Sequence, residues 1–316
     1  MIRTAGIWDR SARPRYFIAG DIGHIWQGSG IKGPFLSDIL VPVADLISAK
    51  QVEMFEALVE AGSTILIDSG CFTLANAHAN KHGIELIAAL ALPPERLDGY
   101  QALFDRYVEV MRAYGERSWG YIEFDVGGRE IKTRTRTRLE AMGLRPIPVY
   151  HPFSDGWDYF DYLAQNYDRI CLANLGTAPP ATRKRLVATT WERARAYPDL
   201  YIHCLGLSAS PLMVAYPLGS CDSSSWTSVE RWGELRVWAA TQELWDAGRG
   251  WRRRVGSDRE ARDGADACYG LLGWDGAMRS RVMLRMLADQ VRELGCDPSG
   301  INMGKRDARP GSDRRQ

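Results

Sequence analysis

Three aspartates of this chain each follow a short apolar run and have glycine or serine within the next two residues. They are Asp68 in Ile-Leu-Ile-Asp-Ser-Gly, Asp125 in Ile-Glu-Phe-Asp-Val-Gly, and Asp222 in Leu-Gly-Ser-Cys-Asp-Ser. Such runs predict β-strands that end close to the aspartate. In an α/β barrel the carboxyl ends of the strands form one face, and that face carries the chemistry. We therefore predict that the three carboxylates converge, either around an electron-poor carbon or around a metal ion.

The segment that begins with Asp68 has the composition of a ligand-binding turn. Ser69 and Gly70 follow the carboxylate, and Phe72 comes shortly after them. Glycine tolerates positive φ, which lets the backbone approach a ligand closely. An aromatic ring can stack on a planar base with a gain of about 1–3 kcal/mol. The structural alternative is that Asp68 caps the next helix and Phe72 belongs to the core.

Asp125 and Asp222 offer two further acidic groups. Glu123 and Asp125 fall on the same side of an expected strand, because side chains alternate with period two, and in a barrel that side would be the interior. At the strand end, Asp125 can accept hydrogen bonds from the N–H groups of a purine. Asp222 precedes a run of serines, whose hydroxyl groups keep a carboxylate ionised, as a nucleophile requires. Here too a helix cap is the structural alternative.

Two histidines follow apolar runs in the same way. His151 and His203 end expected strands, so they either line the site or are structural. His203, Cys204 and Cys221 are the residues from which a metal site could be built, but no closely spaced Cys/His set supports one. We therefore predict no metal and no cofactor.

Basic residues cluster in two places. The first cluster follows Asp125 and includes Arg129, Lys132 and Arg134, and the second consists of Arg252, Arg253 and Arg254. Both are candidates for contact with the phosphates of a nucleic acid. The more usual meaning of such a run is a solvated helix face.

The elements that must position these groups alternate along the chain. Short apolar runs predict eight strands, at 16–19, 39–43, 64–67, 121–124, 146–150, 169–172, 201–204 and 217–221. Helical patterns lie between most of them, as at 97–114, where apolar residues fall on one face and Gly115 follows. This alternation predicts an α/β fold, a (β/α)8 TIM barrel with additional C-terminal helices, and a doubly wound open sheet is the alternative.

The domain organisation follows from these patterns. Residues 1–250 are expected to form the barrel, 251–303 a helical extension packed on it, and 304–316 a disordered polar tail. The additional helices are expected at 229–247 and 278–294. Residues 75–94 carry Asn, His and Gly and predict a long loop, which is either a substrate loop or a plain insertion.

Composition excludes several classes of protein. The chain has 316 residues, of which 45% are hydrophobic and 25% charged, and a net charge of +1. These values are typical of a globular protein with a large core and no global preference for nucleic acid or membrane. No run approaches the roughly 18 apolar residues of a membrane helix, and the N-terminus lacks the apolar core of a signal peptide. The six cysteines are widely spaced, so we expect a reduced, cytoplasmic protein.

Taken in order, these motifs resemble the guanine transglycosylase family, that is, the queuine tRNA-ribosyltransferases and their DNA-acting relatives. The likeness is strongest to the short phage-type, DpdA-like members and extends from about residue 16 to residue 226. The segment 68–72 looks like the family's Asp-Ser-Gly-Gly-Phe/Tyr element. The segment 172–177 looks like its base-contacting strand, and 203–211 resembles its Gly-x-Gly/Ser-x-Pro element.

The resemblance implies that guanine in a polynucleotide is exchanged for a 7-deazaguanine through a covalent aspartyl-glycosyl intermediate. Asp222 occupies the position of the nucleophile that attacks C1′, and Asp68 that of the base that takes a proton from the incoming purine. Asp125 would read the purine edge, and Phe72 and Leu205 would sandwich the ring. The other substrate-binding residues that the resemblance implies are Ser69, Gly70, Asn174, Gly176, His203 and Gly206.

The chain departs from the family pattern at two points. Cys71 stands where the family has a second glycine, and the Cys-x-Cys-x-x-Cys…His zinc cluster of the tRNA enzymes is missing. The second departure favours DNA as the substrate, with tRNA as the alternative. The expected partners are this nucleic acid and a 7-deazaguanine such as preQ0, without a membrane, and a homo-oligomer or partner subunit is compatible with the resemblance.

Two other functions remain open from the sequence. In the first, the three aspartates bind Mg²⁺ through oxygen in a metal-dependent barrel enzyme. In the second, the chain is a nucleic-acid-binding barrel without catalytic activity.

Overall fold

The computed structural model describes residues 14–29, 38–208, 210–216, 218–224, 234–236 and 252–254. For residues 24, 27–29, 234–236 and 252–254 it describes the backbone alone. The predicted helix at 278–294 and the predicted tail at 304–316 lie outside the described residues.

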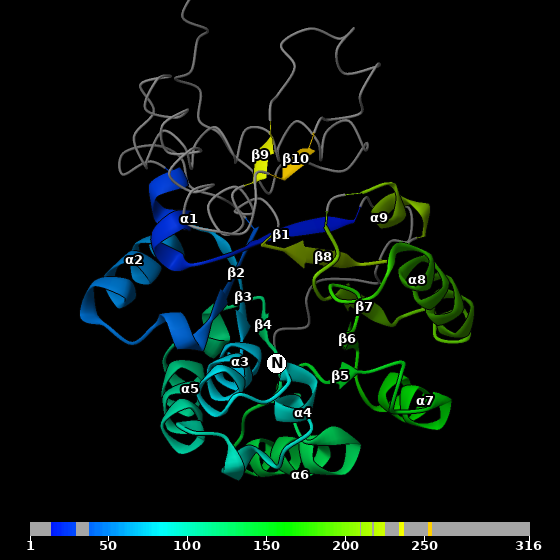
Figure 1. The fold of residues 1–316 in the computed structure, drawn as a ribbon, viewed down its shortest axis with the longest axis horizontal. Helices are drawn as coiled ribbons and strands as arrows, with labels where there is room; N and C mark the ends of the chain where they lie inside the picture. The colour runs from blue at the N-terminus through cyan, green and yellow to red at the C-terminus, as the bar shows by residue number, and fades with distance from the viewer. Residues whose placement is uncertain are drawn as a thin grey trace, which may run out of the picture.

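Eight parallel strands form the central sheet (Figure 1). They are β1 Arg15–Ala19, β2 Asp38–Pro42, β3 Thr64–Asp68, β4 Gly120–Tyr121, β5 Val149–Tyr150, β6 Arg169–Leu172, β7 Tyr201–Cys204 and β8 Ser220–Ser223. Their order is β4-β3-β2-β1-β8-β7-β6-β5. The two ends of this order meet through a parallel bridge between Ile122 and Ile147. The predicted TIM-barrel fold is thereby confirmed.

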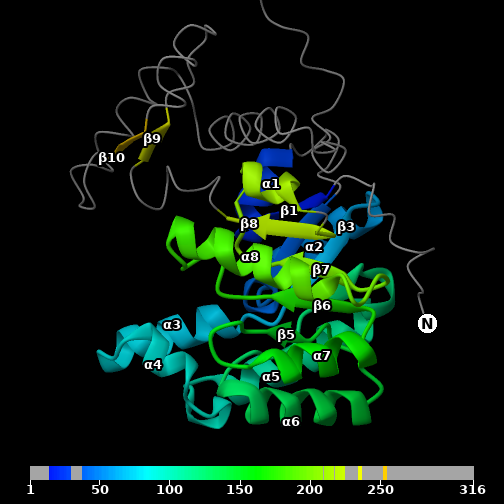
Figure 2. The same ribbon diagram turned by 90° about the vertical axis from the view of Figure 1, so that its right-hand side faces the viewer.

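Helices surround the strands, as both ribbon views show (Figures 1 and 2). They are α1 Ile22–Ser29, α2 Ala49–Glu60, α3 Cys71–His82, α4 Leu86–Leu90, α5 Tyr100–Tyr114, α6 Gly128–Ala141, α7 Trp157–Asn166, α8 Pro180–Ala194 and α9 Pro211–Ala215. Short 3-10 turns occur at η1 Val43–Asp45, η2 Pro94–Arg96 and η3 Gly115–Arg117. The predicted helix at 97–114 is confirmed as α5.

The predicted long loop at 75–94 is wrong, because most of this segment lies in α3 and α4. Cys71, Ala75, His78 and Ala79 form the buried face of α3, which is the spacing of a helix even though the residues are small or polar. Gly83, with φ of 63°, ends the helix in the left-handed conformation. The two helices are an insertion between β3 and α5. The backbone N–H of Gly127, just after β4, donates to the carbonyl of Leu90 at the end of α4, so the insertion lies at the carboxyl ends of the strands.

The core of the protein consists of two apolar clusters, one inside the barrel and one between the strands and the helices. The inner cluster includes Phe17, Leu66, Val149 and Cys171, and the outer cluster fills the space between strands and helices. Strand side chains alternate with period two, so the positions that follow Leu66 and Val149 on the inner side are 68 and 151. Position 222 faces inward as well, because it is in register with Phe17.

A short antiparallel pair follows the barrel in sequence. It consists of β9 Glu234–Arg236 and β10 Arg252–Arg254. The predicted helix at 229–247 is therefore wrong at Glu234–Arg236, and the predicted helical extension at 251–303 begins with a strand. The rest of both segments lies outside the described residues. Among the described helices, none has the length and apolar character needed to cross a bilayer.

Candidate active site

The three aspartates lie at the same end of the barrel. Asp68 is the last residue of β3 and Asp222 lies inside β8, not after the strand as the sequence pattern indicated. Burial raises the pKa of Asp68 to about 7, and the charges of Asp125 and Asp222 add to this effect, while the N–H of Gly70 opposes it. The electrostatic coupling of all three groups supports the predicted convergence. Near neutral pH, Asp68 therefore exists in both its protonated and its ionised form.

Asp222 is buried, and the groups that contact its carboxylate do so through one oxygen. Its Oδ1 lies 3.2 Å from Nε2 of His203 and accepts the N–H of Gly206 at 3.1 Å. Nδ1 of His203 is in turn 2.8 Å from the hydroxyl oxygen of Ser220. Within the described part of the chain both contacts use Oδ1, so Oδ2 of Asp222 is left without a hydrogen bond and is the oxygen available to attack an electrophile.

The N–H of Gly206 reaches Asp222 because of the backbone conformation at this glycine. Gly206 has a φ of 69°, and a Cβ atom built on it would lie 3.1 Å from Cα of Gly176. The loops after β6 and β7 thus pack together through two glycines, which the resemblance had assigned to base binding. The structure gives both a packing role and gives Gly206 an additional contact with the candidate nucleophile.

Asp125 has the opposite electrostatic character from Asp68. Burial acts to raise the pKa of Asp125, but the neighbouring ring of His151 and the charge of Lys132 outweigh it, so the pKa lies below its ordinary value. Nε2 of His151 lies 3.4 Å from Oδ2 of Asp125, and it is a buried nitrogen without a well-aligned acceptor among the described residues. Asp125 is therefore an ionised acceptor beside Asp68.

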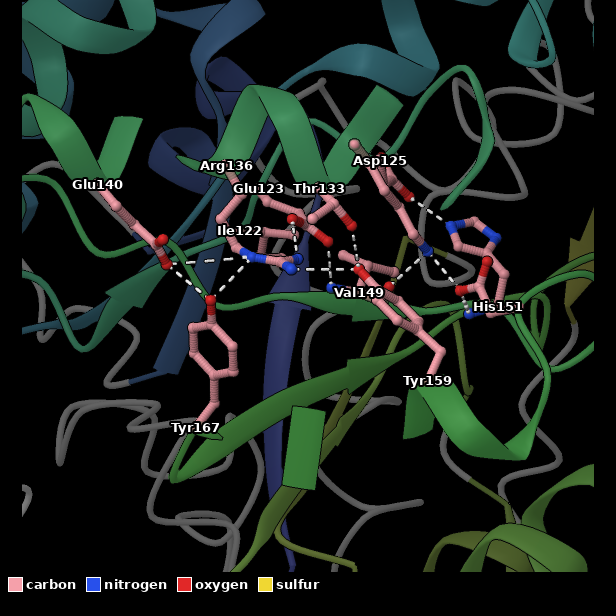
Figure 3. A network of polar contacts seen from close by, with 12 residues as sticks. Ile122, Glu123, Asp125, Thr133, Arg136, Glu140, Val149, His151, Tyr159 and Tyr167 are labelled. Atoms are coloured by element: carbon pink, nitrogen blue, oxygen red, sulfur yellow. Dashed lines mark hydrogen bonds and ion pairs between the residues drawn. The ribbon is translucent and has the colours of Figure 1, made fainter. Parts of the chain in front are cut away.

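Asp125 reaches the site because β4 and β5 do not continue as a pair beyond the bridge between Ile122 and Ile147. We call the junction where Glu123 and Lys132 contact Val149 the seam (Figure 3). Beyond the Ile122–Ile147 bridge, side chains replace the missing strand partners of Val149. The N–H of Val149 donates to Oε1 of Glu123 at 2.6 Å, and its carbonyl accepts from Nζ of Lys132 at 2.7 Å. The backbone at Asp125 is therefore no longer part of a strand.

The prediction that Glu123 points into the barrel is wrong. Ile122 faces the interior, so the next side chain points outward, toward α6. There Oε2 of Glu123 accepts from Nη1 of Arg136 at 2.7 Å, and both side chains are fully buried. Arg136 also contacts the hydroxyl groups of Tyr159 and Tyr167 (Figure 3). Sequence reasoning missed Arg136 because a basic residue in a charged run usually indicates a solvated face.

The residues of the turn after β3 have different environments. Gly70 has a φ of 80°, as expected for this turn, and a Cβ at this position would lie 3.1 Å from Cβ of Ala44. Ser69 is completely buried and its hydroxyl accepts the N–H of Cys71. It therefore shapes the turn and offers no surface to a substrate, which corrects its predicted role. Phe72 is 53% exposed in the first turn of α3, so its ring is accessible for stacking.

Asn174 and Leu205 follow β6 and β7. Asn174 has a φ of 64°, a strained conformation that asparagine tolerates better than most residues. Its side-chain oxygen is buried without a hydrogen-bond partner in the described part of the chain, and such orphaned acceptors need an explanation. Leu205 packs against the apolar interior of the barrel. The loops after β6 and β7 thus offer this acceptor on Asn174 and an apolar side chain on Leu205.

The predicted phosphate-binding residues are only partly supported. Lys132 is fully buried and paired with Asp155, so it cannot contact phosphate, which corrects that prediction. Arg129 is exposed but binds Asp158 at 2.7 Å, and Arg134 is exposed on α6. The side chains of Arg252, Arg253 and Arg254 lie outside the described residues.

The aspartates are not arranged as a metal site. In the part of the chain that the structure describes, the residues whose ligand atoms lie within 4.8 Å of one another are His78, His82 and Asp98. Asp68, Asp125 and Asp222 do not form such a group, which disfavours the hypothesis of a shared Mg²⁺. Sequence reasoning missed the histidine pair, although its spacing of four residues on a helix is a recognisable signal.

No protein-family model matches this chain, and no curated protein matches it in sequence. In structure it is similar to the carboxyl transferase domain of pyruvate carboxylase from Rhizobium etli, with a TM-score of 0.37 and 12% identity over 92% of this chain and 55% of that one. It is also similar to nitroalkane oxidase from Streptomyces ansochromogenes, with a TM-score of 0.37 and 10% identity over 90% of this chain and 98% of that one. This chain thus spans about half the length of the first of these proteins. Similarities of this size say nothing about its activity.

Proposed function

We propose that this chain is a base-exchange enzyme that replaces guanine in a polynucleotide, preferably DNA, with a 7-deazaguanine. The observation that carries the proposal is the pairing of two unlike carboxyl groups at one face of the barrel. Asp222 keeps one oxygen without a hydrogen bond in the described part of the chain, and the pKa of Asp68 is raised by burial to about 7. The pKa of Asp125, the third carboxyl group, lies below its ordinary value, and carboxyl groups whose environments drive their pKa values apart are typical of acid–base sites.

In the first half of the reaction the target base leaves. Oδ2 of Asp222 forms a bond to C1′ while the C1′–N9 bond breaks, and the electron pair stays on the departing guanine. Protonated Asp68 supplies the proton that this base needs. The transition state has oxocarbenium character, which a nearby carboxylate stabilises, as in retaining glycosidases. The product of this half is a glycosyl ester of Asp222.

In the second half the new base enters. Ionised Asp68 takes the N9 proton of the 7-deazaguanine, N9 attacks C1′, and the C1′–O bond breaks with its electron pair returning to Asp222. The same carboxyl group therefore acts first as an acid and then as a base. A pKa near the working pH is the value at which one group performs both tasks well.

Recognition of the base uses acceptors near these two groups. Ionised Asp125 and the unpartnered side-chain oxygen of Asn174 are suited to the N–H groups of a guanine-type base. Phe72, which is exposed, and Leu205 would cover its two faces. A base buried in a duplex must leave the stack to reach such a site, which costs a few kcal/mol.

The experiment measures incorporation of labelled guanine or a labelled 7-deazaguanine into duplex DNA and into tRNA, side by side. We expect label in DNA from the wild type and none from Asp222→Asn. Asp105→Asn is the matched control, because Asp105 is an exposed aspartate on α5, and it should keep full activity. Label in tRNA alone would identify the tRNA alternative. Full exchange by Asp222→Asn would exclude the proposed nucleophile, and no label with cell extract added would favour the binding-only alternative.

A further inference from the structure

A cluster of donor groups lies in the insertion, away from the three aspartates. His78 and His82 are one turn apart on α3, with ring centroids 4.3 Å from each other. Asp98, just before α5, faces both rings. Its Oδ2 lies 2.8 Å from Nε2 of His82 and 3.6 Å from Nδ1 of His78. A zinc ion with ligand bonds of about 2.0–2.2 Å holds neighbouring tetrahedral donors about 3.3–3.6 Å apart, so an ion fits between these groups once Oδ2 of Asp98 and the His82 ring move apart by less than about 1 Å.

The His78 ring presents an unprotonated nitrogen to the cluster. Nδ1 of His78 accepts the backbone N–H of Asp98 at 3.2 Å, and a cation takes over this lone pair only when that hydrogen bond breaks. Imidazole and carboxylate groups together suit zinc-like ions better than Mg²⁺ or Ca²⁺, which prefer oxygen ligands alone. His78 is buried while His82 and Asp98 are partly exposed, so an ion can enter from solvent and retain a water molecule as its fourth ligand.

Lys81 is a charged group that an ion must displace. Its Nζ lies 2.8 Å from Oδ2 of Asp98, and its side chain is 68% exposed. Exposed ion pairs of this kind contribute little to stability, and the lysine can swing into solvent. The ammonium group of Lys81 therefore occupies a position close to that of the proposed ion and competes with the ion weakly.

We propose that His78, His82 and Asp98 form a zinc-class metal site that fastens α3 to the start of α5. These elements flank the turn formed by Asp68, Ser69 and Gly70: α3 begins at Cys71, and a Cβ on Gly70 would lie 3.5 Å from a side-chain carbon of Leu103 on α5. A metal ion at this position braces the insertion beside the candidate active site. It has no part in the base-exchange steps, so the proposal stands independently of the proposed function.

The test is titration of the purified, metal-stripped full chain with Zn²⁺ and, separately, with Co²⁺. We expect one tightly bound ion per chain, visible absorption bands of tetrahedral Co²⁺ with nitrogen ligands, and a higher Tm with Zn²⁺. His82→Ala and Asp98→Asn should each lose at least about tenfold in affinity and lose the rise in Tm. Both residues are partly exposed, so these variants should still fold.

Two further variants sharpen the result. Lys81→Gln removes the competing ammonium, and we expect it to bind Zn²⁺ more tightly than the wild type, an outcome that a merely structural histidine pair would not produce. Asp105→Asn removes an exposed carboxylate from α5 outside the cluster and should bind like the wild type. If the wild type binds no Zn²⁺ at micromolar concentration, or if His82→Ala and Asp98→Asn bind it unchanged, the proposed site does not exist.

Discussion

At the scale of single residues, the site depends on opposite shifts in the pKa values of two carboxyl groups, those of Asp68 and Asp125. Burial and the charges of Asp125 and Asp222 raise the pKa of Asp68 to about 7. The ring of His151 and the charge of Lys132 overcome burial at Asp125 and lower its pKa. The site therefore holds a proton on Asp68 and a negative charge on Asp125 at the same pH. Such a difference between two groups is what acid–base chemistry at neutral pH requires.

This arrangement costs stability at high pH, which Asp68→Asn should reveal. The pKa of Asp68 is about 7 in the folded protein, against 3.8 for an ordinary aspartate, so the folded state binds the proton more tightly. The contribution of Asp68 to stability is present at low pH and is lost as the pH rises through about 7. We expect Asp68→Asn to be more stable than the wild type by on the order of 2 kcal/mol at pH of about 8, and by much less at pH of about 4.

Urea unfolding at both pH values measures this difference. Asp105→Asn on the surface is the control, and its effect should be small and equal at the two pH values. A stabilisation by Asp68→Asn that does not depend on pH would mean that the pKa of Asp68 is not raised.

Gly206 gives a second prediction at this scale. In Gly206→Ala the new Cβ would lie 3.1 Å from Cα of Gly176, so the loop must shift and the N–H bond to Asp222 is lost. The N–H of Gly206 positions the carboxylate of Asp222 through Oδ1, and a misplacement of about 1 Å can cost about 10²-fold in rate, so we expect a loss of base exchange of about 10² with the fold intact. Gly143→Ala is the matched control, since Gly143 has a φ of 82° and nothing within 4 Å of its Cβ position. Equal activity of the two variants would contradict the role of Gly206.

At the scale of elements, the seam between β4 and β5 is what aims Asp125. Side chains of Glu123 and Lys132 bind the backbone of Val149 where a strand would otherwise do so. Arg136 and Asp155 then balance the charges of these two side chains. A buried ion pair does not by itself stabilise a fold, but breaking one leaves an uncompensated charge. The seam therefore closes the barrel through side-chain hydrogen bonds. Because β4 needs no further strand pairing there, the segment that carries Asp125 can leave the sheet.

Glu123→Gln tests the seam. It removes the buried counter-charge that contacts Arg136 at 2.7 Å, and we expect a loss of about 3 kcal/mol in the free energy of unfolding, measured with urea. Glu140→Gln is the control, because Glu140 lies 4.0 Å from Nε of Arg136 and is 33% exposed, and it should cost less than about 1 kcal/mol. In the double variant Glu123→Gln/Arg136→Met the loss should be smaller than the sum of the two single losses. Additive losses would show that the two side chains do not act as a pair.

At the scale of the whole molecule, the net charge of +1 provides no general attraction to a polyanion. The DNA binding that we propose must then come from local basic side chains, and the structure reduces the predicted set in the cluster that follows Asp125. Lys132 is buried in the seam and Arg129 is paired with Asp158, whereas Arg134 is exposed on α6. Of the three predicted residues in this first basic cluster, Arg134 is therefore the one that we expect to contact phosphate.

Arg134→Gln should lower DNA affinity equally for all sequences and reduce the slope of log K against log salt by about 0.9. Fluorescence anisotropy with labelled duplexes at several salt concentrations measures both quantities. The control is Arg112→Gln, an exposed arginine in the last turn of α5, which should leave the slope unchanged. Equal slopes for wild type and Arg134→Gln would place the phosphate contacts elsewhere.

The sequence by itself determined the strand–helix alternation, the barrel class and the place of Asp68 at the end of a strand. These follow from local apolar periodicity, which is readable along the chain. Only the tertiary structure decided the short β4, the outward turn of Glu123, the burial of Lys132 and the helical insertion at α3 and α4. Each depends on partners far away in sequence, such as Val149 for Glu123 and Asp155 for Lys132. Local patterns cannot reveal these partners, because a buried charge is tolerated only where folding supplies its counter-charge and hydrogen bonds.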